Sequence, residues 1–399
     1  MKNALKNDLK VVQLGEVLDS LENGSRPKGG VGDLSKGIPS IGGEHINSLG
    51  GFSFEKIKYI SEDFFNSFRR GKIKENDILV VKDGATTGKV AFVDKRFPFD
   101  KAAVNEHVFV LRVKTNLVIP KYLFYHLFSP IGQSQIDENF HGAAIGGINS
   151  QFVNNYKLPL PLLPIQKKIV SILENAEKAK EMRKTADELT KDFLKSIFIE
   201  MFGDPVSNSK TFPIVKLKDL ALIERNSVTA DNVQEGDKYV GLEHLESESG
   251  RIIKIISVSD GELKSNKFSF DENCILYGKL RPYLNKIALP HFKGICSTDI
   301  VPIRPIKDKS NKYFISYILK QPYYIQLATD RSVGANLPRL SPRELEIFEI
   351  INPPLPLQQE FAARVKEVEQ LKEQQKKSKE QIDNLFNVLI QKAFKGELI

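Results

Sequence analysis

The sequence predicts an α+β (mixed α/β) protein in which two similar modules are each followed by a long helix. Three observations predict this class. Segment 161–166 reads PLLPIQ, and segment 353–358, about 192 residues later, reads PPLPLQ. Each junction opens a long charged stretch whose apolar residues recur at helical spacing. The region before each junction carries short apolar runs broken by glycine, which are typical of strands and loops.

The first module is expected to alternate strands with glycine-rich loops. Short apolar runs predict strands at 38–42, 57–60, 78–81, 90–93 and 108–113. Pro120 opens a helical stretch at 120–129, because proline is favoured in the first turn of a helix. Clusters of glycine and proline predict loops at 24–32, 83–88 and 142–147.

The second module repeats this order. Strands are expected near 238–242, 252–258, 274–277, 286–289 and 300–304, followed by a helix near 312–320. Local sequence is repeated as well, since Ile41-Gly42-Gly43-Glu44-His45-Ile46 matches Val240-Gly241-Leu242-Glu243-His244-Leu245. The expected division is therefore a module at 1–160, a helix at 161–205, a module at 206–352 and a helix at 353–399.

The two helical stretches carry matching apolar seams at close to heptad spacing. Both seams become polar at the same place, with Arg183 beside Ala186 and Gln375 beside Ser378, and such a patch can fix register. The residues assigned to a coiled-coil seam are Ile169, Leu173, Ala176, Phe193, Ile197, Phe361, Val365, Val368, Leu371, Ile382, Leu385 and Leu389.

Each long helix is expected to pack against the other. A pseudo-twofold pair, with one helix leaving each module, would run antiparallel. A helix that spans one of these stretches would measure roughly 55 Å. It could set two modules about one DNA turn or somewhat more apart. A pseudo-twofold chain suits a pseudo-twofold partner, of which duplex DNA is the commonest.

Composition sets the remaining bounds. The chain has 399 residues, is 41% hydrophobic and carries a net charge of +8, which is compatible with a polyanionic partner without requiring one. Cys274 and Cys296 cannot alone form a structural zinc site, and sparse cysteine fits a reducing cytoplasm. No apolar stretch is long enough to span a bilayer, and the start lacks a signal peptide. The expected location is cytoplasmic, with no membrane partner.

In its order of parts the chain resembles the specificity subunit of Type I restriction–modification systems. The resemblance is carried by a variable module, a Pro-Leu-Pro-Leu/Ile-Gln junction and a long helix, all repeated. Within the modules, Asp77-Ile78-Leu79 followed by Gly84…Gly88-Lys89-Val90-Ala91 resembles that family's target-recognition domain. Its counterpart is Cys274-Ile275-Leu276…Gly278…Lys286-Ile287-Ala288.

The resemblance implies a chain that does no chemistry and has no catalytic, metal or cofactor site of its own. Each module would read one half of a bipartite, asymmetric sequence in double-stranded DNA. The helices would dock two modification subunits, which use S-adenosylmethionine to methylate adenine N6. Restriction subunits would add ATP-driven translocation and magnesium-dependent cleavage.

Basic and polar loop residues are the candidates for contact with DNA. Arginine pairs bidentately with guanine, asparagine with adenine, and lysine mostly neutralises phosphate. The first module offers Arg26, Lys28, Lys82, Thr86, Thr87, Lys89, Asn105 and His107. The second module offers Arg225, Asn226, Lys279, Arg281, Tyr283, Asn285, Lys286, Arg331, Asn336 and Arg339.

Other motifs point to catalysis only weakly. Segment 84–90 departs from a phosphate-binding loop in its glycine spacing and has valine where a magnesium-binding hydroxyl is required, so it is either a DNA-facing loop or a plain hairpin. Asn352-Pro353-Pro354 lacks the aromatic residue of adenine methyltransferases. Glu262-Leu263-Lys264 lacks a second acid for a metal nuclease. His45 and His244, at equivalent positions, favour a structural hydrogen bond over DNA or metal contact.

Two alternatives therefore remain beside the specificity subunit. One is a self-sufficient nuclease or methyltransferase, and the other is a coiled-coil scaffold whose modules bind protein. Turnover by the purified chain would identify the first, and absence of salt-dependent DNA binding, alone or with modification subunits, would favour the second.

Overall fold

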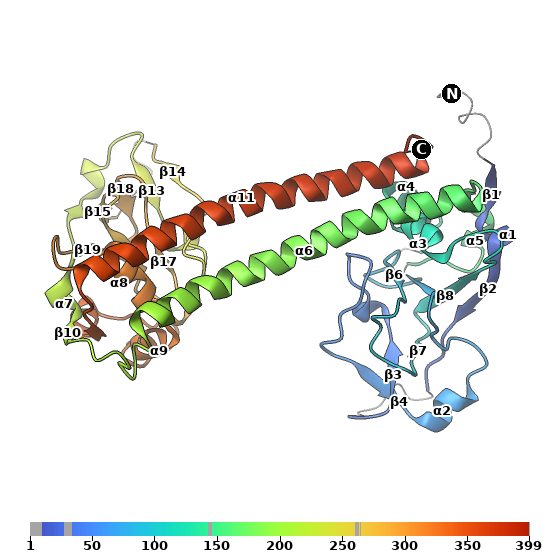
Figure 1. Ribbon diagram of the computed structural model, residues 1–399, viewed down its shortest axis with the longest axis horizontal. Coiled ribbons are helices and arrows are strands. Elements are labelled where there is room, and N and C mark those ends of the chain that lie inside the picture. The colour runs from blue at the N-terminus through green and yellow to red at the C-terminus, as the bar shows by residue number, and fades with distance from the viewer. Residues whose placement is uncertain (1–9, 28–33, 143–145, 260–262, 264, 399) are drawn as a thin grey trace. The chain divides into compact units, whose positions relative to one another are not determined.

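A computed structural model describes residues 10–27, 34–142, 146–259, 263 and 265–398 (Figure 1). The chain forms two compact units. Unit 1 holds the described residues up to Lys184 together with those from Lys377 onward, and unit 2 holds Thr185–Lys376. Each unit therefore combines one module with a part of both long helices.

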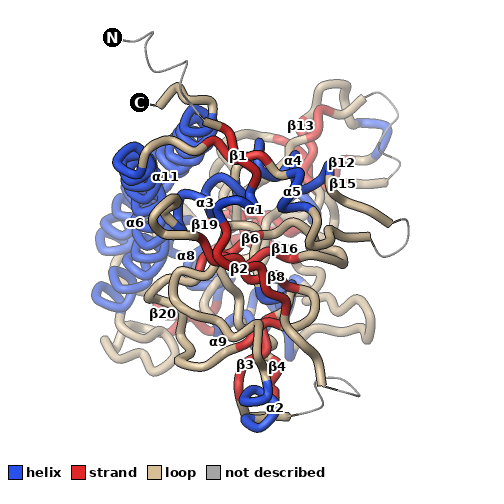
Figure 2. The backbone as a smooth tube through the Cα atoms, turned by 90° about the vertical axis from the view of Figure 1, so that its right-hand side faces the viewer, coloured by secondary structure: helices blue, strands red, loops and turns tan. Residues whose placement is uncertain are grey.

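Unit 1 is built on an antiparallel four-stranded sheet and a smaller three-stranded sheet. The large sheet has the strand order β2-β8-β5-β6 and the small one β4-β3-β7, in which β3 and β7 are parallel. Strands β1 and β9 pair separately. Figure 2 shows β3, β4 and α2 close together in this unit. The strands are β1 Val11–Gln13, β2 Leu18–Asn23, β3 Ile38–Ile41, β4 Lys58–Ile60, β5 Ile78–Val81, β6 Val90–Phe92, β7 Ala103–Val104, β8 Val108–Val113 and β9 Lys157–Pro159.

Most helices of unit 1 share one apolar core with the large sheet, while α2 packs with β4 and β7 in a separate small cluster. The helices are α1 Leu14–Val17, η1 Gly43–His45, α2 Glu62–Ser67, α3 Pro120–Phe128, α4 Pro130–Glu138, α5 Phe152–Asn155 and the long α6 Leu163–Phe202, which continues into unit 2. Helix α3 begins at Pro120 as predicted. Its buried face joins Ile78 and Leu111 of the sheet in one apolar cluster.

Unit 2 repeats the topology of unit 1. Its four-stranded sheet β11-β19-β16-β17 corresponds to β2-β8-β5-β6, and within its five-stranded sheet β14-β13-β18 corresponds to β4-β3-β7. Strands β10 and β20 pair as β1 and β9 do. The strands are β10 Ile214–Lys216, β11 Ala221–Ile223, β12 Ser227–Val228, β13 Lys238–Val240, β14 Ile256–Ser257, β15 Lys267–Phe270, β16 Ile275–Gly278, β17 Ile287–Ala288, β18 Gly294–Cys296, β19 Ile300–Pro305 and β20 Glu349–Ile351.

The helices of unit 2 complete the repeat, with α8 in the place of α3. They are α7 Leu217–Leu220, η2 Ala230–Asn232, η3 Leu242–His244, η4 Pro282–Leu284, α8 Lys312–Leu319, α9 Pro322–Asp330, α10 Pro342–Glu346 and the long α11 Leu355–Phe394. The predicted duplication and the mixed fold class are thus confirmed. The strand expected over 252–258 is only the two-residue β14. The strands that were not predicted are β1, β2, β7 and β9 of unit 1 and β10, β11, β12, β15, β18 and β20 of unit 2.

A buried glutamine explains why the two junctions share a sequence. The Gln166 side chain accepts a hydrogen bond from Ile119 N (2.9 Å) and donates to the carbonyls of Leu117 (2.9 Å) and Pro161 (2.8 Å). Gln358 accepts from Asn311 N (2.9 Å) and donates to Pro353 O (2.8 Å). Ile119 and Asn311 are the caps of α3 and α8. Each junction therefore fixes a long helix to the shorter helix of its own module.

The long helices pair within each unit. In unit 2, Phe198 and Phe202 of α6 contact Phe361 of α11, while Gln375 donates to the hydroxyl of Thr190 (2.7 Å). As residue numbers rise along α6 they fall along α11, so the pair is antiparallel as predicted. In unit 1, Lys180 of α6 lies 3.0 Å from Asp383 of α11. Residues Ile169, Leu173, Ala176, Phe361, Val365 and Val368 are buried, and Ile197, Ile382 and Leu389 are half-buried.

Three of the predicted seam positions are wrong. Phe193, Leu371 and Leu385 are 56%, 42% and 54% exposed. After Thr190 and after Ile382 the buried face takes a four-residue step, to Leu194 and Phe386, where the heptad pattern predicted three.

For Phe193 and Leu385 the reason is that the C-terminal end of each long helix packs against a module as well as against the other long helix. Phe202 contacts Phe314 of α8, and Phe394 contacts Tyr122 and His126 of α3. This second contact turns the buried face away from a two-helix seam, and it does so identically in both copies. Neither these helices nor the others in the described part of the chain combine the length and apolar character needed to cross a membrane.

Candidate nucleic-acid interface

In unit 1, the loop between β5 and β6 packs beside a second loop that follows α4. We call residues 82–89 tip loop 1 and the described residues of 141–148 flanking loop 1. Ile148 N donates to Lys82 O (2.6 Å) and Gly84 N donates to Gly146 O (3.4 Å). Gly84 and Gly88 both have positive φ, 88° and 86°, which closes the tip loop tightly.

Unit 2 builds the same arrangement from different residues. Tip loop 2, residues 279–286, joins β16 to β17, and flanking loop 2 is residues 333–340. Leu340 N donates to Lys279 O (2.9 Å) and Arg281 N to Pro338 O (2.7 Å), which repeats the two bonds of unit 1. Each unit thus presents a tip loop held by a flanking loop. Exposed loops on a rigid scaffold can vary in side chain without altering the fold.

Three of the predicted contacts of unit 1, Arg26, Lys82 and His107, are linked through Glu106 and Asp83 by hydrogen bonds and ion pairs. Arg26 lies 3.4 Å from Glu106, which lies 3.3 Å from His107; His107 also pairs with Asp83, and Asp83 lies 3.8 Å from Lys82. Asn105 accepts from His107 N (3.0 Å). These side chains, from residues far apart in the sequence, form one partly exposed polar cluster beside tip loop 1.

In unit 2 five predicted residues gather around tip loop 2, namely Lys279, Arg281, Tyr283, Asn336 and Arg339. Arg281 donates to Asn336 O (3.2 Å), and Arg339 lies 2.9 Å from the Asp299 carboxylate, which raises the pKa of the Arg339 guanidinium. Tyr283 is 48% exposed on η4. Arg331 pairs with Glu344 (3.4 Å) and Arg225 with Glu346 (3.7 Å), so both lie beside α10. Asn226 is exposed next to Arg225.

Several residues predicted to contact DNA are instead buried, half-buried or hydrogen-bonded within their own unit. Asn285 is buried and donates to Glu248 (3.0 Å), so it is not available to DNA. Lys286 donates to Leu242 O (2.8 Å), and the hydroxyl of Thr87 donates to Gly84 O (2.7 Å) within its own loop. Thr86 and Lys89 are half-buried in tip loop 1. Lys28 lies outside the described residues.

Sequence reasoning overlooked the carboxylates of these clusters. The prediction considered basic and polar side chains alone. In the structure, Asp83 pairs with Lys82, Glu106 with Arg26 and Asp299 with Arg339. Asp83 and Glu106 directly follow or precede predicted contacts in the sequence, which was an available signal. The exposed Arg69 and Arg70 were also missed. They precede Gly71, which packs against Gly24 near Arg26.

The two matched histidines are structural, as the sequence favoured. The Nδ1 atom of His45 accepts from Gly42 N and that of His244 from Gly241 N, both at 2.9 Å, and both side chains are buried. Among the residues that the structure describes, no three histidine, cysteine or acidic side chains are grouped to hold a metal ion. Glu262 and Lys264 lie outside the described residues.

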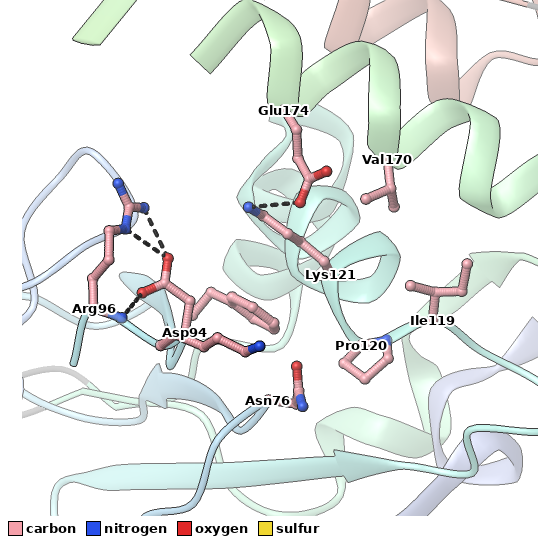
Figure 3. A pocket seen from close by; sticks show the side chains of 10 residues that line it. Asn76, Asp94, Arg96, Ile119, Pro120, Lys121, Val170 and Glu174 are labelled. Carbon is pink, nitrogen blue, oxygen red and sulfur yellow. Dashed lines mark hydrogen bonds and ion pairs between the residues drawn. The ribbon is translucent and has the colours of Figure 1, made fainter. Parts of the chain in front are cut away.

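A hollow of about 390 Å³ in unit 1 lies between the loop after β6, α3 and α6 (Figure 3). Four of its five charged side chains are paired with one another, Asp94 with Arg96 (2.8 Å) and Lys121 with Glu174 (3.1 Å), and the fifth is Lys95. None of the predicted DNA contacts lines this hollow. We therefore assign the candidate interface to the tip and flanking loops.

The duplicated fold and repeated loop pairs define a two-module recognition protein with helices that connect the modules. The chain belongs to the family described as the Type I restriction modification DNA specificity domain, whose model matches residues 6–191 and 209–384. The resemblance noted from the sequence is thereby confirmed.

Curated relatives are named specificity subunits. The Type I restriction enzyme MjaVIII specificity subunit of Methanocaldococcus jannaschii is 23% identical over 98% of this chain and 93% of its own length. The EcoDI specificity subunit of Escherichia coli is 28% identical over 39% of this chain and 35% of that protein, so the chain spans about a third of it. These names agree with the prediction that the chain is the specificity component and not a catalytic subunit.

Solved structures support the fold. The S subunit of a Type I restriction–modification system from M. genitalium has a TM-score of 0.55 at 17% identity, with 98% of each chain covered. A chain from a structure of complex assembly and conformational transition in the Type I R-M system has a TM-score of 0.56 at 16% identity, also with 98% of each covered.

Proposed function

We propose that this chain is the DNA-sequence-specificity subunit of a Type I restriction–modification complex. Each module reads one half of a bipartite, asymmetric target in double-stranded DNA. The observation that carries the proposal is the repeated pair of tip and flanking loops, held by equivalent backbone hydrogen bonds but bearing different side chains. Two modules with the same backbone but different loop side chains suit a target whose two halves differ in sequence.

Exchange of one module tests this division of labour. Residues 1–160 are replaced by the first module of a divergent relative, and the hybrid is expressed with its modification subunits. We expect only one half of the methylated sequence to change, because the loops of residues 206–352 are untouched. A change in both halves, or in neither, contradicts the proposal. Affinity of the complex for DNA should also fall steeply with added salt, because phosphate neutralisation releases counterions.

We further propose that the long helices dock two modification subunits, with restriction subunits joining them. Those partners supply the S-adenosylmethionine, ATP and magnesium chemistry, and this chain binds no cofactor. Support comes from apolar side chains on the exposed faces of both helices, in particular Phe193 and Leu385. They occupy equivalent positions of the repeat, one in each unit. Equivalent exposed anchors fit two copies of one partner.

Substitution of these anchors tests docking separately from folding. Phe193→Asp and Leu385→Asp should each weaken binding of one modification subunit while the circular dichroism spectrum and thermal midpoint stay close to wild type. Leu194→Asp is the matched control, because Leu194 is half-buried against the apolar core of unit 2 and its replacement should lower the thermal midpoint. Undiminished assembly of the double variant F193D/L385D with both partners contradicts the docking proposal.

A further inference from the structure

Arg281 holds a backbone conformation that its side chain does not favour. Its φ and ψ are 52° and 64°, in the left-handed region where residues other than glycine and asparagine are strained. Asn285, at the other end of the same loop, is also left-handed. Strain that the surrounding structure maintains is often found at functional positions.

The first module shows what the loop itself requires. Tip loops 1 and 2 have the same length between equivalent strands, so Gly84 corresponds to Arg281 and Gly88 to Asn285. Both glycines have positive φ. The backbone bonds also match, since Thr87 N donates to Gly84 O and Leu284 N donates to Arg281 O. The loop therefore requires a left-handed residue here, and module 2 places an arginine where glycine would be unstrained.

The charge of Arg281 is also left available. Arg225, Arg331 and Arg339, the other predicted arginine contacts of unit 2, each pair with a carboxylate. Within the part of the chain that the structure describes, no carboxylate forms an ion pair with Arg281. Its one side-chain hydrogen bond, to Asn336 O, orients the exposed guanidinium and leaves most of its five donors free.

We infer that Arg281 is a specificity-determining residue that reads a guanine of the half-site recognised by module 2. This inference rests on the proposed function. A guanidinium donates two parallel hydrogen bonds to guanine O6 and N7, a pattern that distinguishes guanine from the other bases in the major groove. Module 1 has Gly84 at the corresponding place, so its half-site is read without this contact.

The test uses the full chain in complex with its modification subunits and a library of duplex DNA with randomised positions. Bound DNA is sequenced for wild type, Arg281→Gly and Arg281→Lys. Arg281→Gly restores the residue that the first module carries, so the fold is preserved. We expect preference for guanine at one position of one half-site to fall about 10- to 100-fold, with the other half-site unchanged. Arg281→Lys keeps the charge but loses the planar fork, so it should weaken the preference less than Arg281→Gly does while keeping more affinity.

Controls separate the possible failures. Lys309→Ala removes one exposed positive charge of unit 2 away from the loops and should leave the selected sequence unchanged. An unchanged sequence for Arg281→Gly overturns the inference, as does an equal loss of affinity for all sequences, which would make Arg281 a phosphate contact. Absence of sequence selection by the wild-type complex would instead contradict the proposed function.

Discussion

Phe193 and Phe198 lie five residues apart on α6, and their replacement by alanine tests the corrected assignment of the buried face. Phe198 is fully buried and its ring lies 4.7 Å from Tyr317, 5.0 Å from Phe202 and 5.5 Å from Phe361, between ring centroids. Truncation of a buried phenylalanine costs about 3–5 kcal/mol through lost transfer free energy and the cavity that remains. Phe193 is more than half exposed, so its truncation should change the free energy of unfolding by no more than about 0.5 kcal/mol.

Thermal unfolding followed by circular dichroism measures the difference. For a unit of this size each kcal/mol lowers the midpoint by roughly 2–4 °C, so Phe198→Ala should lower it by roughly 6–20 °C. Phe193→Ala should leave it within about 2 °C. The heptad assignment makes the opposite prediction, because it buries position 193. Equal destabilisation by the two variants, or a larger effect of Phe193→Ala, would refute the packing described for unit 2.

Three further outcomes follow from buried polar groups. Burial lowers the pKa of His126 to about 3. The unfolded chain therefore binds an extra proton below about pH 6.5. The free energy of unfolding of unit 1 should fall by about 2–3 kcal/mol between that pH and pH 4.5 because of this residue. Urea titrations at the two pH values should show that His126→Gln removes this contribution. Gln166→Leu leaves three backbone groups without their side-chain partner and should destabilise unit 1 by about 3–5 kcal/mol, with hydrogen exchange accelerated in α3 but not in α8. Arg112→Met leaves the buried carboxylate of Asp77 and the half-buried carboxylate of Glu22 without their partner, at a cost of about 3–5 kcal/mol. Arg304→Met, at a more exposed site, should cost less in the same chemical denaturation assay.

Much of the fold could be predicted because it depends on local sequence patterns. The strands at 78–81 and 108–113, the helix that begins at Pro120 and both long helices appear where apolar periodicity and proline placed them. The flanking strands β1 and β9 were not predicted. Each has three residues, which is too short for periodicity, and they form only because the chain returns to pair them.

The candidate interface could be predicted in its loops but not in its side chains. Tip loop 1 was placed correctly by its glycines, and the predicted residues of tip loop 2 lie beside Asn336 and Arg339 as a cluster. The sequence comparison matched Lys89-Val90-Ala91 with Lys286-Ile287-Ala288, but it did not single out the residue equivalent to Gly84. The strand registers have the same offset and identify Arg281 as the residue equivalent to Gly84.

The sequence by itself determined that the chain is a duplication, that each copy ends in a long helix and that the helices run antiparallel. These properties depend on repeats and periodicity, which are contained in short stretches of the chain. The tertiary structure alone decided which face of each helix is buried near its end, because Phe314 and His126 come from distant segments. It also decided which of the predicted arginine contacts in the described part of unit 2 are neutralised, because an ion pair depends on distances in space that sequence separation does not encode.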